Sequence, residues 1–331
     1  MKRIDVHSHV IPQTIIEAMR ANRELYQTEI KGQGRQLKFV RGKVEFDLVP
    51  EFYDADAKVE AMDRKGLDIS VVSPGPQAFF YGLGNADEAL RTAAIVNEGV
   101  AKMVAARPDR LRGMATLPMQ HPDAAIAELE RVAREYGFRA VELGTAIGDE
   151  ELADPRFRPV LRRIQELKMV IFAHPNTQGS SGRLDCYYLT NLIGNPLDTT
   201  IMVGKLMFSG VLDELPELKI LLAHGGGFLP YQIGRFQHGH AVRPDTAAVT
   251  ASRPLDMFRR FYFDALTHSP QAIRYLIDTV GSERVMIGTD SPFDMGEEHP
   301  LASLEAVPGL TREERENVCC RSALRLFDGK L

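Results

Sequence analysis

The sequence has little cysteine, and what it has is poorly placed for a disulfide. Only three of its 331 residues are cysteine, and Cys319 and Cys320 are adjacent while Cys186 stands alone. Neither a disulfide framework nor a CxxC metal site fits this spacing. We therefore expect a protein of a reducing compartment.

Long hydrophobic runs are also missing. No apolar run reaches the ~18 residues of a membrane span, and the best candidate, 201–212, is interrupted by Lys205. Charge at Lys2 with no apolar leader after it gives no sign of a signal peptide. These absences predict a soluble, cytoplasmic protein without a membrane partner.

Positive charge is not in excess, since the formal net charge is −5. This balance gives no support for nucleic acid or an anionic membrane as a partner. The chain is 44% hydrophobic and 26% charged, which is ordinary for a globular enzyme. One elaborated α/β barrel accommodates this length as well as two domains would, and we expect a single domain over residues 1–331.

Nucleotide and serine-hydrolase motifs are absent as well. The pairs Gly32/Gly34 and Gly82/Gly84 lack a third glycine, and there is neither a P-loop nor a G-x-S-x-G elbow. The HGGG sequence at 224–227 is therefore not expected to be an esterase oxyanion hole. Its glycines are expected to permit a sharp turn with close backbone approach.

What the sequence does contain is an alternation of short apolar runs with longer amphipathic segments. Eight strands are predicted, at 4–10, 69–73, 113–117, 140–144, 169–174, 220–224, 261–265 and 285–290. Helices are predicted at 55–66, 86–106, 122–136, 156–167, 198–209, 229–238, 270–280 and 311–326, with 239–254 as a polar loop. Buried parallel strands covered by helices predict an α/β fold, and eight strands favour a distorted (β/α)8 TIM barrel. A doubly wound open sheet is the alternative.

Residues 22–50 depart from this alternation. They are charged and contain two short alternating runs, at 37–40 and 43–48. We interpret them as a small hairpin inserted after the first strand. It is either a lid at the active-site mouth or a surface excursion without function.

Four histidines and one aspartate fall at the carboxyl ends of predicted strands. They are His7, His9, His174, His224 and Asp290. In a barrel these ends form the active site together. Residues two apart on a strand face the same side, so the first two histidines can reach one ion. A single histidine at such a place is usually structural, but the set predicts a site for a divalent metal such as zinc.

Other titratable groups are weaker candidates. Asp264 ends the seventh strand and could either support a metal ligand or cap a turn. The remaining histidines are expected to be caps or surface groups.

Taken together, these residues resemble the amidohydrolase superfamily, and within it the branch typified by aminocarboxymuconate semialdehyde decarboxylase. The resemblance covers nearly the whole chain and is carried by the sequences at 5–9, 174–175, 206–210, 224–227 and 288–293. It implies a mononuclear metal site with His7, His9, His174 and Asp290 as ligands. It also implies that His224 is the acid/base group, with Asp290 acting in catalysis beside it.

The fourth strand is informative within this resemblance. Binuclear relatives carry a carboxylated lysine there, whereas this strand reads Ala-Val-Glu-Leu-Gly at 140–144. The missing lysine argues for one metal. Glu142 as a bridging carboxylate is the remote alternative.

The substrate-binding arginines match only in part. Arg235, eleven residues after His224, matches an arginine that the neighbouring subunit of a dimer donates to the substrate carboxylate. The second arginine should fall near 46–47, and none is there. Arg41 or Lys43 could replace it; otherwise the substrate is a monocarboxylate of the hydroxybenzoate type.

Three hypotheses follow. The first is a metal-dependent, non-oxidative decarboxylase of a small unsaturated or aromatic carboxylic acid, with one divalent metal, zinc before manganese or cobalt, and no organic cofactor. The second is a hydrolase of a lactone or amide that uses the same site. The third is a binding protein without activity, which the intact set of five site residues disfavours.

Overall fold

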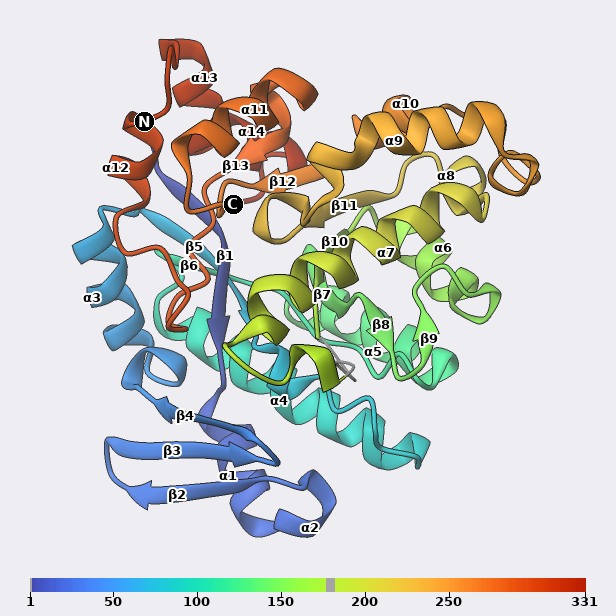
Figure 1. Ribbon diagram of the computed structural model, residues 1–331. Helices are drawn as coiled ribbons and strands as arrows, with labels where there is room; N and C mark the ends of the chain where they lie inside the picture. Colours follow the sequence, from blue (N-terminus) through green and yellow to red (C-terminus); the bar gives the residue numbers. More distant parts are fainter. Residues whose placement is uncertain (1, 177–181) are drawn as a thin grey trace.

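Eight parallel strands form the centre of the protein, which is described by a computed structural model over residues 2–176 and 182–331 (Figure 1). One sheet has the order β1-β5-β6 and the other the order β13-β12-β11-β10-β7. The strands are β1 (Ile4–Val10), β5 (Ile69–Pro74), β6 (Leu111–Gly113), β7 (Ala140–Gly144), β10 (Val170–His174), β11 (Lys219–Leu222), β12 (Tyr262–Asp264) and β13 (Val285–Met286). The α/β architecture expected from the sequence is confirmed.

Isolated bridges join the two sheets at both edges. Ala115, just after β6, pairs with Val141 of β7, and Asp5 and Ser8 of β1 pair with Ile287 and Ser291 after β13, all in parallel. The amide of Val6 donates to the carbonyl of Ile287 at 2.9 Å. The edge strand β6 of one sheet therefore lies beside β7 of the other, and the edge strand β1 lies beside β13.

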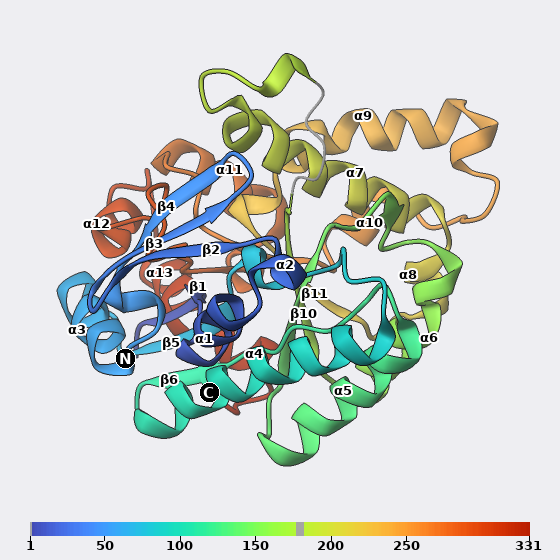
Figure 2. The same ribbon diagram turned by 90° about the horizontal axis from the view of Figure 1, so that it is seen from below.

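Helices follow the strands and surround them in both views (Figures 1 and 2). The longer ones are α1 (Gln13–Ala21), α3 (Ala55–Lys65), α4 (Ala86–Ala106), α5 (Pro122–Glu135), α6 (Arg158–Glu166), α7 (Asn195–Phe208), α9 (Leu229–Val242) and α11 (Pro270–Val280). The short ones are α2 (Arg23–Tyr26), α8 (Val211–Glu214), α10 (Pro254–Phe258), α12 (Pro300–Glu305), α13 (Arg312–Glu316) and α14 (Ser322–Leu326). Helical segments at 86–106 and 270–280 begin and end where the sequence predicts.

Several predicted boundaries are wrong. The third strand ends at Gly113, where the sequence predicts its start, because only Ala115 beyond it keeps a bridge. The segment 311–326 is helical from Arg312 to Leu326 as predicted, but a π-helical turn at Asn317–Arg321 interrupts the α-helix between α13 and α14. Helix α9 continues to Val242, into the segment predicted as a loop.

The two strand ends nearest the predicted site are also shorter than expected. Strand β11 ends at Leu222 and β13 at Met286, so His224 and Asp290 lie in turns beyond them. The chain leaves β13 because the amides of Thr289 and Asp290 both turn to the carbonyl of His7, at 3.1 and 2.8 Å. Both site residues still follow the carboxyl ends of their strands.

The segment after β1 contains three antiparallel strands where the sequence predicts a two-stranded hairpin. The predicted hairpin corresponds to β3 (Gln36–Arg41) and β4 (Val44–Leu48), and β2 (Glu29–Gln33) pairs with the far side of β3. Strand β2 has no fully buried residue. Its sequence therefore lacks the alternation of apolar and polar residues by which a half-buried strand is predicted. Figure 1 shows this small sheet at one end of the molecule.

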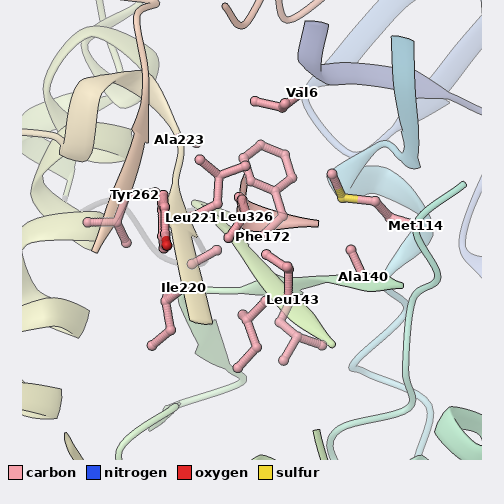
Figure 3. Packing of buried hydrophobic residues seen from close by; sticks show 14 of the residues in the cluster. Val6, Met114, Ala140, Leu143, Phe172, Ile220, Leu221, Ala223, Tyr262 and Leu326 are labelled. Carbon is pink, nitrogen blue, oxygen red and sulfur yellow. The ribbon is translucent and has the colours of Figure 1, made fainter. Parts of the chain in front are cut away.

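Apolar side chains from the strands fill the interior. Figure 3 shows Phe172, Leu143 and Ile220 close together, from β10, β7 and β11. All three are at most 1% exposed. Burying such side chains is the main favourable term in folding, and a continuous core holds the strand ends in fixed relative positions. None of the helices in the described residues is long and apolar enough to cross a membrane.

Candidate metal centre

His7 and His9 lie side by side on β1, and both are fully buried. Because side chains two apart on a strand face the same way, the two rings meet, and their Nε2 atoms are 3.0 Å apart. Two ring nitrogens at this distance converge on a common point. The pairing predicted from the His-x-His spacing is present in the structure.

His174 and Asp290 complete the cluster from β10 and from the turn after β13. The Asp290 Oδ1 atom lies 3.0 Å from His9 Nε2 and 3.2 Å from His7 Nε2. One ligand atom from each of the four residues lies within 4.8 Å of every other. The structure thus brings together all four residues that the sequence nominated as ligands.

The hydrogen bonds of the rings test whether a metal fits. His7 Nδ1 is 2.6 Å from Asp264 and His174 Nδ1 is 2.8 Å from the Pro175 carbonyl, so each Nδ1 donates its proton outward. This leaves a lone pair on each Nε2 that points into the cluster. His174 Nε2 and Asp290 Oδ1 are buried without a hydrogen-bond partner. Three imidazole nitrogens and one carboxylate oxygen suit a divalent metal ion.

The electrostatics of the cluster also favour a cation. Burial opposes charge on His7, yet Asp290 and Asp264 outweigh burial and raise the pKa of His7 to about 10, so without a metal the Nε2 atom of this ring carries a proton. A bound cation would take the place of that proton. Burial, with the neighbouring rings of His9 and His224, lowers the pKa of His174 well below its ordinary value. His174 is therefore neutral, the form that binds metals. Burial would raise the pKa of Asp290, but the surrounding imidazoles hold it well below its usual range.

Asp264, whose role the sequence left open, both supports a ring and caps a turn. Its Oδ2 contacts His7 Nδ1 at 2.6 Å and accepts from the amide of His224 at 2.9 Å. Its Oδ1 accepts from the amide of Gly225 at 2.8 Å. A carboxylate on the outer nitrogen of a metal-binding histidine fixes its tautomer and orientation. One buried aspartate thus positions His7 and the turn that carries His224.

His224 lies next to the four-residue cluster on its open side. Its Nε2 is 3.6 Å from Asp290 Oδ2, the oxygen that does not face His7 and His9. Its side chain is 19% exposed, whereas those of His7 and His9 are fully buried. This ring is therefore more accessible than the four clustered residues and lies beside them, within 3.6 Å of Asp290.

The turns of the site are strained at the functional residues. His224 and Asp290 have φ angles of +54° and +56°, in the left-handed region that non-glycine residues rarely adopt. Such conformations persist only where the surrounding structure enforces them, and they are concentrated at active sites. Gly288 is required before Asp290 because a Cβ there would lie 2.9 Å from the Cβ of His7.

Glu142, the remote candidate for a bridging carboxylate, lies beside the other edge of His9. Its Oε2 is 3.6 Å from His9 Nδ1, and both carboxylate oxygens are buried without a hydrogen-bond partner. The ring of His9 stands between it and the converging Nε2 atoms. This position favours support of His9 over a bridge between two metals.

The candidate carboxylate-binding residues lie on two separate parts of the fold, with Arg41 and Lys43 at the turn between β3 and β4 and Arg235 on α9. Arg235 is exposed on α9 and makes no hydrogen bond or ion pair among the described residues. Lys43 is 92% exposed and pairs with Asp185 at 3.5 Å. Arg41 is mostly buried, stacks on Phe80 with its Cζ 4.8 Å from the ring centroid, and has a buried Nη2 without a partner.

Comparison with known proteins shows the family to which the chain belongs. The model of the amidohydrolase family matches residues 4–329, and the chain belongs to that family. It is 30% identical over 328 residues to 2-amino-3-carboxymuconate-6-semialdehyde decarboxylase of Dictyostelium discoideum, covering 98% of this chain and 91% of that protein. It is 31% identical over 252 residues to gamma-resorcylate decarboxylase of Polaromonas, covering 72% and 77%. The solved structure of Metarhizium anisopliae IDCase superposes with a TM-score of 0.85 at 25% identity, over 100% and 98% of the two chains.

Proposed function

We propose that the protein is a metal-dependent, non-oxidative decarboxylase of a small aromatic or muconate-like carboxylic acid. The observation that carries the proposal is the convergence of His7, His9, His174 and Asp290 on one point, with His224 beside Asp290. The relatives named above, decarboxylases of a carboxymuconate semialdehyde and of a resorcylate, support the substrate class.

The residues of the site have separable roles in this reaction. A divalent metal held by the three histidines and Asp290 would act as a Lewis acid that anchors substrate oxygens. The bond from the ring or diene carbon to the carboxylate breaks, CO2 leaves, and the electron pair stays on carbon. His224 delivers from Nε2 the proton that takes the place of CO2. Because the conjugated substrate accepts the electron pair, no organic cofactor is needed.

Arg41 and Arg235 are the candidates for binding a substrate anion. Arg41 is favoured over Lys43 because the buried Nη2 atom of Arg41 has no hydrogen-bond partner, whereas the exposed ammonium of Lys43 already pairs with Asp185. Arg235 is exposed and has no hydrogen bond or ion pair among the described residues, so we propose that it acts in the site of a second subunit. A guanidinium holds a carboxylate by two parallel hydrogen bonds and stays charged throughout.

A homodimer is supported by the surface around Arg235. Helices α7 and α9 lie side by side at one edge of the molecule (Figures 1 and 2). They and the turns before them expose several large apolar side chains: Ile193, Leu197, Ile201, Phe228, Tyr231 and Val242. Exposed apolar side chains gathered on two neighbouring helices support an interaction surface there.

Four finer points belong to the same proposal: the closed barrel, the metal, the cellular location and the role of residues 22–50. We propose that the eight strands close into one (β/α)8 barrel domain over residues 1–331, which the bridges at both sheet edges support. We propose that the metal is zinc and that the protein acts in the cytoplasm. Residues 22–50 are proposed to cover the site, and the 5.3 Å between the ring centroids of His9 and Phe293 supports this, since Phe293 packs on Phe46.

The direct test is release of CO2 from a panel of acids. Purified protein with one equivalent of Zn²⁺, Mn²⁺ or Co²⁺ is incubated with hydroxybenzoates and muconate-type acids. We expect CO2 from at least one acid, with its decarboxylated product in equal amount. If no acid of the panel releases CO2 and the protein hydrolyses lactones instead, the decarboxylase proposal is wrong and the hydrolase alternative is supported.

A further inference from the structure

Lys58 is a fully buried lysine on α3, 1% exposed, that the roles above do not use. Its ammonium is within 3.3 Å of three oxygens: the His9 carbonyl at 2.9 Å, the Ser8 hydroxyl at 3.2 Å and the Ser291 carbonyl at 3.3 Å. A buried charge is tolerated only where its hydrogen bonds are satisfied. Lys58 therefore stays in place because these oxygens hold it.

The oxygens belong to the two segments that carry proposed metal ligands. One is the carbonyl of His9 itself, at the end of β1. Another is the carbonyl of Ser291, the residue after Asp290, which also accepts from the amide of His9 at 2.8 Å. The ammonium thus joins the backbone of one ligand to the residue next to another.

Lys65, on the same helix, is a buried lysine that, among the described residues, does not hydrogen-bond to the segments of the proposed metal ligands. It is also buried, and its ammonium pairs with the carboxylate of Glu298. Lys58 instead donates to two carbonyls and a hydroxyl, none of which neutralises its charge. Its hydrogen bonds therefore fix the positions of two backbone carbonyls and one hydroxyl, whereas an ion pair would fix only the position of a side-chain carboxylate.

We propose that Lys58 is a positioning residue of the metal centre, which sets the spacing between His9 and Asp290. The inference rests on the proposed function, because it assumes that these two residues bind the metal. Without the ammonium, the turn at Asp290 is held to β1 by fewer bonds. Because the backbone of Asp290 is in the unfavourable left-handed region, we expect that turn to move toward a less strained conformation. The ligand set would then open and bind its metal less tightly.

The experiment compares Lys58→Met with Lys65→Met, a matched loss of a buried ammonium on the same helix. The dissociation constant for Zn²⁺ is measured by competition with a chelator. The visible absorption spectrum of the Co²⁺-loaded protein reports the coordination geometry independently of activity. Circular dichroism and Tm confirm that each variant is folded. Lys58→Arg is a third variant, which keeps the charge but presents a planar set of donors.

Lys58→Met is expected to bind Zn²⁺ about 10- to 100-fold more weakly, as losses of groups behind metal ligands do, and to change the Co²⁺ spectrum. Lys65→Met is expected to lower Tm while leaving both unchanged. If Lys58→Met does not fold, Lys58→Arg is expected to show the same changes in smaller degree. Wild-type affinity and spectrum in the folded Lys58 variants would overturn the proposal, as would an equal loss in Lys65→Met.

The outcomes separate this inference from the proposed function. A wild-type protein that binds no metal would overturn both. A wild-type protein that binds Zn²⁺ but releases no CO2 would overturn decarboxylation alone. In that case a weaker Zn²⁺ affinity of Lys58→Met still supports the positioning role.

Discussion

At the scale of single residues, the proposed function assigns the binding of a cation and the transfer of a proton to different side chains. The outer nitrogens of His7 and His174 are bound to protein oxygens, so their inner nitrogens are fixed as acceptors. His224 has a partly exposed ring and a buried Nδ1 without a partner. Asp290 divides its two oxygens between the cluster and His224.

Replacing His224 therefore separates the two tasks. His224→Ala is expected to keep its metal and to lose about 10²- to 10⁴-fold in kcat, the usual worth of a general acid or base. Metal content by elemental analysis and CO2 release are measured on the same sample. Loss of the metal from this variant would make His224 a ligand and contradict the assigned role.

How far the sequence predicts the site depends on the kind of residue. The clustering of the four proposed ligands could be predicted because strand alternation places His7 and His9 on one face and strand ends gather His174 and Asp290. Arg41 could be named only as a possibility, because the sequence does not show that its guanidinium is buried. Lys58 could not be found, because in a sequence a lysine on an amphipathic helix indicates the solvated face.

At the scale of elements, boundaries could be predicted where a local signal in the sequence, such as a capping residue, sets them. Helix α4 begins at its cap Asn85, whose side chain accepts from the amide of Glu88 at 3.1 Å, as a capping residue should. The ends of β11 and β13 were predicted too long because tertiary hydrogen bonds, such as the Asp264 carboxylate to the His224 amide, end the strands early. No local pattern carries that information.

The contact between α11 and α13 gives a pH-dependent prediction. Arg274 donates to both oxygens of Glu314, at 2.7 and 3.1 Å, and this lowers the pKa of Glu314 from 4.5 to about 2. A carboxyl whose pKa is depressed by folding stabilises the folded state above its unfolded pKa and ceases to do so as the pH falls through the folded one.

Glu314→Gln is therefore expected to be less stable than the wild type above pH 4.5, by roughly 1 kcal/mol or less because the pair is near the surface. The difference should shrink as the pH falls from 4.5 toward 2. Urea unfolding across this range measures it. A difference that stays constant with pH would show that the ion pair is not its source.

At the scale of the whole molecule, the site is incomplete if Arg235 acts across a dimer. Mixing Arg235→Ala chains with His224→Ala chains is then expected to restore part of the activity that each variant lacks alone. Each heterodimer would combine an intact His224 with the Arg235 of the other chain. Verified heterodimers without activity would contradict a shared site.

The central claim is a single divalent metal held by His7, His9, His174 and Asp290, and metal content per chain tests it most directly. Protein purified without chelators is analysed for zinc, manganese and cobalt beside His9→Ala and Asp290→Ala. The account predicts about one ion per chain in the wild type, as four nitrogen and oxygen ligands require, and its loss from both variants. Two ions per chain, or none, or a full complement in either variant, would contradict it.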